Sequence, residues 1–492
     1  MSKRFFKKHY TLVRIIEVAL DLFFIILSFL LIIQLDGYVH SGDFIKTVKE
    51  LFSNFLSTYY NVFRTQLLYI FTILFFFIVY QVSAIRKSYT QTMADAIIAL
   101  GLSNMIVIVI SILLSKSFAR PELIIYTFLL QVLLFGVYKF VLHKIVSKID
   151  KRKVMIVAKE EEAKLIATKF LMDRDSRRYI KYILFEEKMG NGEIDKLICF
   201  LDKVDDVIIG QGLSENIKNN IMTYCLSKMY KDVYLVPKLY EISIVNSKME
   251  QIRDTPVFVS QSLHLTITQR FLKRTLDISL SIIGLVLLFP LLLVVSLLIK
   301  LNDKGPAFYK QERITRGNKP FMLIKFRTMI VDAEKETGAV WQMENDPRIT
   351  KIGKFLRATR IDELPQLYNV LKGEMTLIGP RPEREIFIQQ FIQSIPDFKY
   401  RVNVKPGITG LAQVLGKYNS EPIDKLRFDL IYIRNYSLLL DIKILLLTIK
   451  AVLSKDSSAT LGIPKFEEII EDKKLVTEPM ILGLEFKKRE VK

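Results

Sequence analysis

The sequence predicts an α/β membrane protein that combines membrane helices with cytosolic modules. Three observations support this fold class. The chain has 492 residues, half of them hydrophobic, and its mean hydropathy of +0.27 is too high for an ordinary soluble protein. Four apolar runs fall in the first 150 residues, and a fifth lies at about 278–299. Elsewhere, short apolar runs alternate with amphipathic stretches, a pattern typical of α/β modules.

Residues 1–150 are predicted to form a four-helix transmembrane domain. Each apolar run is about 20 residues long, which is the length that a helix needs to cross a bilayer. The first run is long for a signal peptide, and no small-residue cleavage site follows it. Segments rich in Lys and Arg precede the first run and follow the second and fourth, so the positive-inside rule places both ends of the domain in the cytoplasm. The runs lie near 15–35, 67–85, 94–114 and 121–142.

Residues 151–265 are predicted to form a Rossmann-like cytosolic domain. KRKVMIVAK is typical of a buried strand, EEEAKLIATKFLMDR of a helix and DDVIIG of another strand. A dinucleotide site would need a glycine-rich turn after the first strand. The turn at 158–162 has no glycine and three glutamates, which would repel a phosphate. We therefore expect a structural or regulatory role for this module, and dinucleotide binding is disfavoured.

The stretch 352–384 carries the densest set of candidate functional residues. Asp362 and Glu363 are predicted to open a helix that Gly373 ends in the left-handed conformation, and a helix start favours ionised carboxylates. Adjacent helical residues diverge by about 100°, so the two carboxylates are expected to have different roles. In the stiff GPRP turn at 379–382, Arg381 offers a planar fork that suits phosphate.

A hairpin is predicted at 305–330, with a turn at 316–319. Because side chains alternate along a strand, the even-numbered residues from Met322 to Phe326 should share one face, and Lys325 and Arg327 the other. Two cations on one strand face indicate either a solvated surface or a site for an anion. Spacing alone leaves these two interpretations equally open.

Charge and cysteine content exclude several other classes of protein. The formal net charge is +20, which favours an anionic membrane face or phosphorylated substrates. The sequence contains no nucleic-acid-binding motif. Its two cysteines, Cys199 and Cys225, lack the spacing of a zinc site or a disulfide framework, and four scattered histidines make a His-based metal site a poor expectation.

The run LRATRIDELPQLYNVLKGEMTLIGPRPER resembles the signature of the bacterial sugar transferases, the polyisoprenyl-phosphate hexose-1-phosphate transferases. The resemblance covers about 270–455 and includes KRTLDISLSIIGLVLLFPLLL, GPAFYKQERITRGNKPFMLIKFRTM and KPGITGLAQVLGKY. It departs from the family pattern TSLDELPQ just before the carboxylate pair, where Arg360 and Ile361 replace the usual Ser-Leu. This departure is not expected to abolish the chemistry.

The resemblance implies specific roles for residues of this chain. Asp362 would be the nucleophile that forms an aspartyl-phosphosugar, and Glu363 would hold Mg²⁺. Lys325 and Arg357 would complete the catalytic set by stabilising phosphate. Substrate or phosphate binding is implied for Arg327, Gly379, Pro380, Arg381, Pro382, Arg384 and Gln413.

The implied reaction moves a hexose-1-phosphate from a nucleotide-diphospho-sugar, expected to be a UDP-sugar, to undecaprenyl phosphate. This would start exopolysaccharide, capsule or O-antigen synthesis at the bacterial inner membrane, with catalysis on the cytosolic face. Two alternatives stay open: an inactive membrane scaffold of a polysaccharide assembly complex, and a nucleotide-sugar hydrolase. The sugar transferred, any ligand of the middle module and a homodimeric state are also left open.

The resemblance also bears on the segment 266–300, where Pro290 interrupts the fifth apolar run. A kinked spanning helix and a re-entrant hairpin both fit this sequence. The family favours the hairpin, and a single crossing would separate the catalytic part from cytosolic nucleotide sugars. The catalytic domain is then expected at 301–455, followed by a charged, irregular tail at 456–492 that is a possible docking segment or dimer arm.

Overall fold

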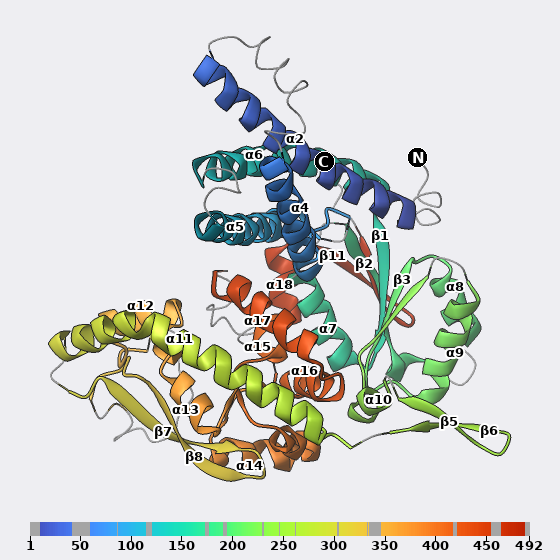
Figure 1. Ribbon diagram of the computed structural model, residues 1–492. Helices are drawn as coiled ribbons and strands as arrows, with labels where there is room; N and C mark the ends of the chain where they lie inside the picture. Colours follow the sequence, from blue (N-terminus) through green and yellow to red (C-terminus); the bar gives the residue numbers. More distant parts are fainter. Residues whose placement is uncertain are drawn as a thin grey trace. The chain divides into compact units, whose positions relative to one another are not determined.

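The computed structural model of the chain divides into two compact units (Figure 1). The first unit combines Met1–Val236 with Pro464–Lys492, and the second consists of Pro237–Ile463. Residues 237–265 thus belong to the second unit, although the sequence analysis assigned them to the middle module. The structure describes residues 10–41, 60–85, 87–114, 121–172, 177–189, 194–228, 231–245, 247–260, 262–302, 305–331, 333, 346–416, 421–453 and 464–487.

The first unit begins with four apolar helices, coloured blue to teal in Figure 1. They coincide with the four predicted runs and comprise α2 (Tyr10–Ser41), α4 (Tyr60–Tyr80), α5 (Tyr89–Leu114) and α6 (Pro121–Ile149). Helices α2, α5 and α6 contain stretches long and apolar enough to span a membrane, whereas the apolar stretch described in α4 is shorter, Leu67–Tyr80. Many large apolar side chains on these helices are exposed, as expected for surfaces that face lipid.

Buried ion pairs connect these helices, a feature that the sequence analysis did not predict. Lys139 Nζ on α6 lies 2.9 Å from Glu17 Oε1 and 2.7 Å from Asp21 Oδ1 on α2. The other carboxylate oxygen of Glu17 accepts a hydrogen bond from Ser83 Oγ at 2.9 Å. Charges inside a membrane bundle are costly unless they are paired. The cluster therefore fixes α2 to α6 and to the loop after α4.

A six-stranded sheet forms the rest of the first unit, in the order β11-β12-β2-β1-β3-β4. Strands β2, β1, β3 and β4 run parallel. Met155 and Val157 pack against α8 and α9 on one face, and Ile156 packs against α7 on the other. The predicted strand, helix and strand appear as β1, α7 and β3. The bounds are β1 (Arg152–Ala158), α7 (Glu160–Met172), β2 (Arg178–Phe185), α8 (Ile194–Leu201), β3 (Asp206–Ile209), α9 (Glu215–Ser227) and β4 (Asp232–Leu235).

Glutamate side chains occupy the loops at the carboxyl ends of these parallel strands. Glu162 accepts hydrogen bonds from the backbone N–H groups of Gln211 and Gly212, at 2.6 and 2.9 Å. Glu187 accepts one from the N–H of Glu160, at the start of α7, at 3.1 Å. Nucleotide-binding sheets of this kind use such loop N–H groups to hold phosphate. Here the chain's own carboxylates take that place.

The C-terminal segment completes the same sheet. Helix α18 (Phe466–Asp472) packs on the α7 face. Strands β11 (Val476–Met480) and β12 (Gly483–Lys487) form an antiparallel hairpin, and β12 pairs with β2. The sequence analysis treated this segment as an irregular tail, but its described part belongs to the first unit. A Cβ atom at Gly483 would overlap the carbonyl oxygen of Ile183, so the close pairing requires glycine.

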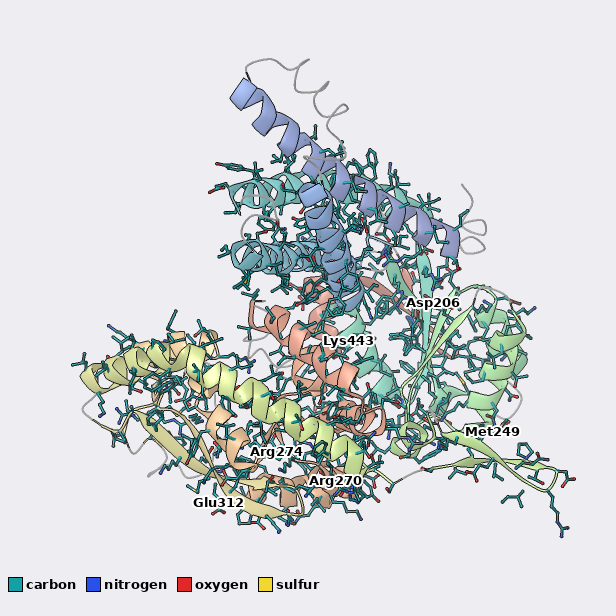
Figure 2. All side chains as sticks on the ribbon, viewed as in Figure 1. Asp206, Met249, Arg270, Arg274, Glu312 and Lys443 are labelled. Carbon is teal, nitrogen blue, oxygen red and sulfur yellow. The ribbon has the colours of Figure 1, made fainter. Side chains whose placement is uncertain are left out.

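The second unit begins with α10 and the mostly exposed hairpin β5–β6, on which Met249 is labelled in Figure 2. Helix α11 and the hairpin β7–β8 follow, and short helices and strands then form the core. The bounds are α10 (Leu239–Ile244), β5 (Lys248–Ile252), β6 (Thr255–Val259), α11 (Ile267–Asn302), β7 (Phe308–Thr315), β8 (Lys319–Phe326), α12 (Lys351–Ala358), η3 (Ile361–Glu363), α13 (Gln366–Lys372), β9 (Thr376–Ile378), α14 (Glu385–Ser394), η4 (Pro396–Asn403), β10 (Gly407–Thr409), α15 (Leu411–Leu415), α16 (Pro422–Arg434) and α17 (Leu438–Leu453).

Helix α11 lies along the second unit over most of its length. It continues as one helix through Pro290, and its ribbon bends in Figure 1. Its first half packs on the main core through Leu280 and Leu288. Its second half packs on β8 and α12 through Val295 and Ile299. The structure therefore shows one helix with both halves attached to the second unit, whereas the sequence left a kinked spanning helix and a re-entrant hairpin open and the family favoured the hairpin.

The predicted hairpin at 305–330 is confirmed as β7 and β8. Phe321 and Leu323 are buried in the main core, whereas Met322 is 46% exposed. Phe326 is buried in a separate cluster with α11 and α12. Both strand faces are therefore covered, because helices pack on each side of β8. Lys325 shares the strand face of Phe321 and Leu323.

Candidate active site

Asp362 and Glu363 lie in the short 3₁₀ turn η3, between α12 and α13. The sequence analysis placed them in the first turn of an α-helix, but α13 begins only after Pro365. Arg360 has a left-handed φ of 57° and reverses the chain before the turn, which separates the two helices. As predicted, Gly373 ends α13 in the left-handed conformation, with a φ of 86°.

Asp362 is 8% exposed and surrounded by charge. Burial raises the pKa of its carboxyl group to about 6, and Glu363 adds to the rise. Lys325, Arg357 and Arg381 act in the opposite direction. The sequence analysis expected the helix start to keep this group ionised. Instead, its ionisation depends on three nearby cations.

Glu363 has a different environment from its neighbour. Its Oε1 atom accepts a hydrogen bond from Arg381 Nη2 at 2.8 Å. Burial acts to raise the pKa of Glu363, but Arg381 and Arg360 outweigh it, so the pKa is lower than usual. The opposite shifts of the two carboxyl groups support the expectation that they have different roles.

Lys325 and Arg357 approach this turn from two elements. Burial lowers the pKa of Lys325 to about 8, and Arg357 and Arg313 add to the effect. Lys325 Nζ lies 5.2 Å from the centre of the Tyr309 ring on β7. Arg357, in the last turn of α12, donates from Nε to Thr328 Oγ1 at 2.8 Å. The predicted pair of cations is thus brought close to Asp362.

The start of α12 crosses the segment after β8 at close range. Thr350 caps the helix, because its Oγ1 accepts a hydrogen bond from the N–H of Gly353 at 2.9 Å. A Cβ atom at Gly353 would overlap the carbonyl oxygen of Thr328. Glycine at this position therefore allows the approach that carries Arg357 to Thr328.

A pocket with a volume of about 460 Å³ opens beside these cations. Arg327, which is 7% exposed, also lines it, and its guanidinium group fills the space where Gly305 lacks a side chain. Most of the other lining side chains are apolar or aromatic. The pocket is lined by Pro306, Phe308, Tyr309, Lys325, Arg327, Thr328, Met329, Ile330, Val331, Ala333 and Arg357.

The GPRP turn is held in place by backbone contacts with β10. The N–H of Gly379 donates to the carbonyl oxygen of Thr409, and the N–H of Gly407 donates to that of Pro380, both at 2.8 Å. The close approach of these two backbone segments explains why residues 379 and 407 are glycines. Gly379 and Pro380 thus act through the backbone and bring Arg381 to Glu363.

Three further predicted residues lie near this turn or beyond it. The carbonyl oxygen of Pro382 accepts a hydrogen bond from Arg313 Nη1 at 3.1 Å. Arg384 occupies the position before α14 and makes no side-chain cap there. Gln413 on α15 donates to the carbonyl oxygen of Ile408 at 3.0 Å. Its hydrogen bond in the described structure supports the β10 loop and does not reach the carboxylate turn.

Asn369 was missed by the sequence analysis although it connects the site's two halves. It is fully buried on α13. Its Oδ1 accepts from the N–H of Ile324 at 3.0 Å, and its Nδ2 donates to the carbonyl oxygen of Met322 at 2.8 Å. Nδ2 also donates to Glu374 at 2.7 Å. Asn369 therefore fixes the strand next to Lys325 against the helix that follows the carboxylates.

Asp277 on α11 joins this helix to β9. Its carboxylate accepts hydrogen bonds from Thr376 Oγ1 at 2.7 Å and from the N–H of Leu377 at 2.9 Å. Both partners belong to β9. Without Asp277, the polar groups at this buried strand edge would lack hydrogen-bond partners. Providing those partners matters more for stability than pairing Asp277 with a cation on the same helix.

The two cations of α11 also contact the core. Lys273 Nζ lies 2.6 Å from Asp441 Oδ2 on α17, and this pair is buried. Arg274, labelled in Figure 2, donates to the last carbonyl oxygens of α13, those of Val370 at 2.5 Å and Leu371 at 2.7 Å. A cation suits the C-terminal end of a helix. The start of α11 is therefore joined to the helix that follows the carboxylate turn.

Comparison with known proteins identifies the family. A sequence model of the family described as bacterial sugar transferase matches residues 268–455. A Bacillus subtilis protein, described as a candidate undecaprenyl-phosphate N-acetylgalactosaminyl 1-phosphate transferase, is 55% identical over 137 residues, which are 27% of this chain and 76% of the relative. The chain belongs to the bacterial sugar transferase family.

Two longer bacterial sugar transferases are also similar to this chain. The UDP-N-acetylgalactosamine-undecaprenyl-phosphate N-acetylgalactosaminephosphotransferase of Aeromonas hydrophila is 45% identical over 187 residues, 37% of this chain and 44% of the relative. The UDP-glucose:undecaprenyl-phosphate glucose-1-phosphate transferase of Escherichia coli is 36% identical over 252 residues, 50% of this chain and 54% of the relative. The matched part thus spans about half the length of each of these two relatives.

The side chains of the site are compatible with Mg²⁺ held jointly with a substrate. Among the described residues, no group of three or more His, Cys, Asp or Glu side chains could hold a metal by itself. Mg²⁺ commonly takes only one or two protein carboxylates and completes its shell with water and substrate phosphate oxygens. Asp362 and Glu363 supply that donor set, and Arg381 donates a hydrogen bond to Oε1 of Glu363.

Proposed function

We propose that this bacterial sugar transferase moves a hexose-1-phosphate from a nucleotide-diphospho-sugar, with UDP as the expected carrier, to a polyprenyl phosphate. The product would start exopolysaccharide, capsule or O-antigen synthesis. One observation carries the proposal: Asp362 is buried, with Lys325, Arg357 and Arg381 close enough to lower its pKa. Relatives named as undecaprenyl-phosphate sugar phosphotransferases support the same reaction class.

The first step would be a displacement at the phosphorus that bears the sugar. A carboxylate oxygen of Asp362 attacks this phosphorus, and the bond between this phosphorus and the bridging oxygen of the diphosphate breaks. The nucleoside monophosphate leaves with the electron pair of that bond. An aspartyl-phosphosugar remains on the enzyme, which divides one difficult transfer into two easier ones.

In the second step the lipid acceptor would release the enzyme. A phosphate oxygen of the polyprenyl phosphate attacks the same phosphorus, and the bond to Asp362 breaks. The products are a polyprenyl diphosphate sugar and a free carboxylate. Because the carboxylate leaves with its electrons, a cationic environment that favours its ionised form assists this step.

Positioning and charge stabilisation account for most of the catalysis in phosphoryl transfer. Lys325 and Arg357 would neutralise the oxygens of the transferred group, and Arg381 would hold the diphosphate beside Glu363. Glu363, with Asp362, would hold Mg²⁺. When bound, the metal would supply Lewis-acid stabilisation of phosphate charge. Glu363 is suited to this role because its lowered pKa keeps it ionised at neutral pH.

The proposed location is the cytosolic face of the bacterial cytoplasmic membrane, with α11 as a re-entrant helix that stays on one side. Both halves of α11 contact the second unit, while Val286, Leu287 and Leu301 on its other side are exposed. A helix that crossed the bilayer could not keep both halves on one cytosolic domain. Cysteine labelling at residues 265 and 305 should find both positions in the cytosol, and labelling from opposite sides would contradict re-entry.

Turnover by purified protein in lipid nanodiscs tests the function. Radiolabelled UDP-sugars would be added with and without undecaprenyl phosphate, and nucleoside monophosphate and labelled lipid would be measured. We expect labelled lipid only when the acceptor is present. Release of sugar phosphate without acceptor would identify a hydrolase, and neither product from a panel of UDP-sugars would favour the scaffold.

A further inference from the structure

The 460 Å³ pocket beside Lys325 has two chemically distinct parts. Lys325, Arg327 and Arg357 give it three cations. Phe308, Ile330, Val331 and other apolar residues form most of the remaining walls, to which Tyr309 and Thr328 add two hydroxyl groups. No Asp, Glu, Asn or Gln appears among its described lining residues. A site that selects a sugar or a nucleobase needs such groups to pair with hydroxyl and amide functions, so this pocket suits a ligand with an anionic head and an apolar body.

The apolar walls of the pocket continue into the membrane helix. Phe308 stacks on Phe326, with ring centres 5.3 Å apart. Phe326 is fully buried against Val295 and Ile299 in the second half of α11. Residues at the rim are half exposed, at 45% for Phe308 and 48% for Val331. Apolar packing therefore connects the pocket wall at Phe308, through the buried Phe326, to the second half of α11.

The other side of the carboxylate turn has a more polar character. Arg381 is paired with Glu363 there, and Arg313 Nη2 donates to Gln311 at 2.6 Å. Arg401 pairs with a buried aspartate and also donates to the carbonyl oxygen of Arg381. Carboxylate, amide and guanidinium groups are the partners that a nucleotide sugar requires. The polar group around Arg381 and the pocket beside Lys325 thus fit two different substrates.

We propose that this pocket is the acceptor site, where the first isoprene units of the polyprenyl phosphate lie against Phe308, Ile330 and Val331. The phosphate then faces the cations on the Lys325 side of Asp362, and the donor approaches from the Arg381 side. This inference rests on the proposed function. It adds that acceptor and donor use separate walls of one site.

Variants of exposed pocket residues separate the two half-reactions. Phe308→Gln and Val331→Asn place polar groups on the apolar wall, and Met322→Gln is the matched control. Met322 lies on the same hairpin and is 46% exposed, but it does not line the pocket. Single-turnover release of nucleoside monophosphate from the donor reports the first step. Steady-state transfer to undecaprenyl phosphate and to the short dimethylallyl phosphate reports the second.

We expect both pocket variants to lose tenfold or more in kcat/KM for undecaprenyl phosphate and to stay within twofold of wild type in the donor step. Their preference for undecaprenyl phosphate over dimethylallyl phosphate should also shrink, and Met322→Gln should match wild type in every assay. Equal loss in the donor step would assign the pocket to the donor. An unchanged kcat/KM for undecaprenyl phosphate would place the chain elsewhere.

Photo-crosslinking tests the site without turnover. A polyprenyl phosphate with a photoreactive group in its first isoprene units would be bound to wild-type protein in nanodiscs and the modified peptides sequenced. Crosslinks within 306–309 or 329–331, competed by undecaprenyl phosphate, support the acceptor site even if no transfer is detected. Crosslinks confined to other segments, or competed equally by the membrane phospholipid phosphatidylglycerol, overturn it. Absence of transfer together with correct crosslinks would contradict only the proposed function.

Discussion

Two regions of the molecule present positive groups that could bind an anion, and they use them in opposite ways. In the first unit, Glu162 and Glu187 accept hydrogen bonds from the loop N–H groups at the carboxyl ends of the strands. Glu186 does the same for the N–H of Ser214 at 2.8 Å. In the second unit, Lys325 and Arg357 adjoin an open pocket. The first region is closed by its own carboxylates, and the second has room for an external anion.

Backbone geometry alone therefore does not define a phosphate site. The first region has suitable N–H groups, but a carboxylate on the same chain is always present at high effective concentration and saturates them. An open cation cluster instead leaves its charge for a substrate. The cost of such a cluster is visible in the lowered pKa of Lys325, because burial and two arginines disfavour its charged form. The following predictions test this contrast.

The largest effect is expected for Asp362→Asn. The amide keeps the size of the side chain but removes the nucleophile, so transfer and trapping of labelled sugar phosphate should fall by about 10³-fold or more. The matched control is Asp254→Asn, in the exposed turn between β5 and β6, which should behave as wild type. Activity near wild type in Asp362→Asn would assign the nucleophile to another residue.

The pH dependence of kcat/KM should be bell-shaped. The nucleophile must be ionised, and the pKa of Asp362 is raised to about 6, so activity should rise about tenfold per pH unit below that value. Lys325 must be protonated, and its pKa is lowered to about 8, so activity should fall above that value. Lys325→Arg should shift the alkaline limb upward, because arginine stays charged. If the alkaline limb of the pH profile is the same in Lys325→Arg as in wild type, a group other than Lys325 causes it.

The next effect concerns the scaffold of the open region. Asn369→Ala removes the partners of two buried backbone groups on β8, which should cost about 1–3 kcal/mol of stability. Transfer should fall by about 10- to 100-fold, since Ile324 precedes Lys325 and small displacements of a charged group are costly. Asn435→Ala, which loses one hydrogen bond within α16, should change thermal melting less and leave transfer unchanged.

Equal rates for Asn369→Ala and wild type, with a lowered melting temperature, would show that Asn369 stabilises the fold without positioning the site. Restoring only the size of the side chain, as in Asn369→Leu, should not recover transfer. Asn369→Gln should recover part of it if its amide can still reach β8.

The sequence predicted features that depend on neighbouring residues. Each of these features is encoded by one short segment of the chain. They are the Asp362–Glu363 pair, the GPRP turn, the β7–β8 hairpin and the left-handed end of α13 at Gly373. Local rules of chain geometry are sufficient for such features, because the interacting atoms lie a few residues apart.

Features that depend on distant partners could not be predicted. Asn369 bonds to a residue 45 positions away, and Lys139 to one 122 positions away. The pairing of β12 with β2 joins the last described strand to the middle of the chain. Alternation along β8 predicted which residues share a face but not which elements cover each face. The raised pKa of Asp362 follows from burial, which a motif does not specify.

The smallest effect is expected in the closed region. Glu162→Gln keeps an oxygen acceptor but weakens two charge-assisted hydrogen bonds to Gln211 and Gly212, which should cost about 1 kcal/mol. The adjacent exposed Glu161→Gln is the matched control and should melt like wild type. Both variants should retain wild-type transfer, measured in nanodiscs beside thermal melting, because this carboxylate closes a loop and contacts no substrate. A tenfold loss of transfer in Glu162→Gln alone would show that the closed region regulates the open one.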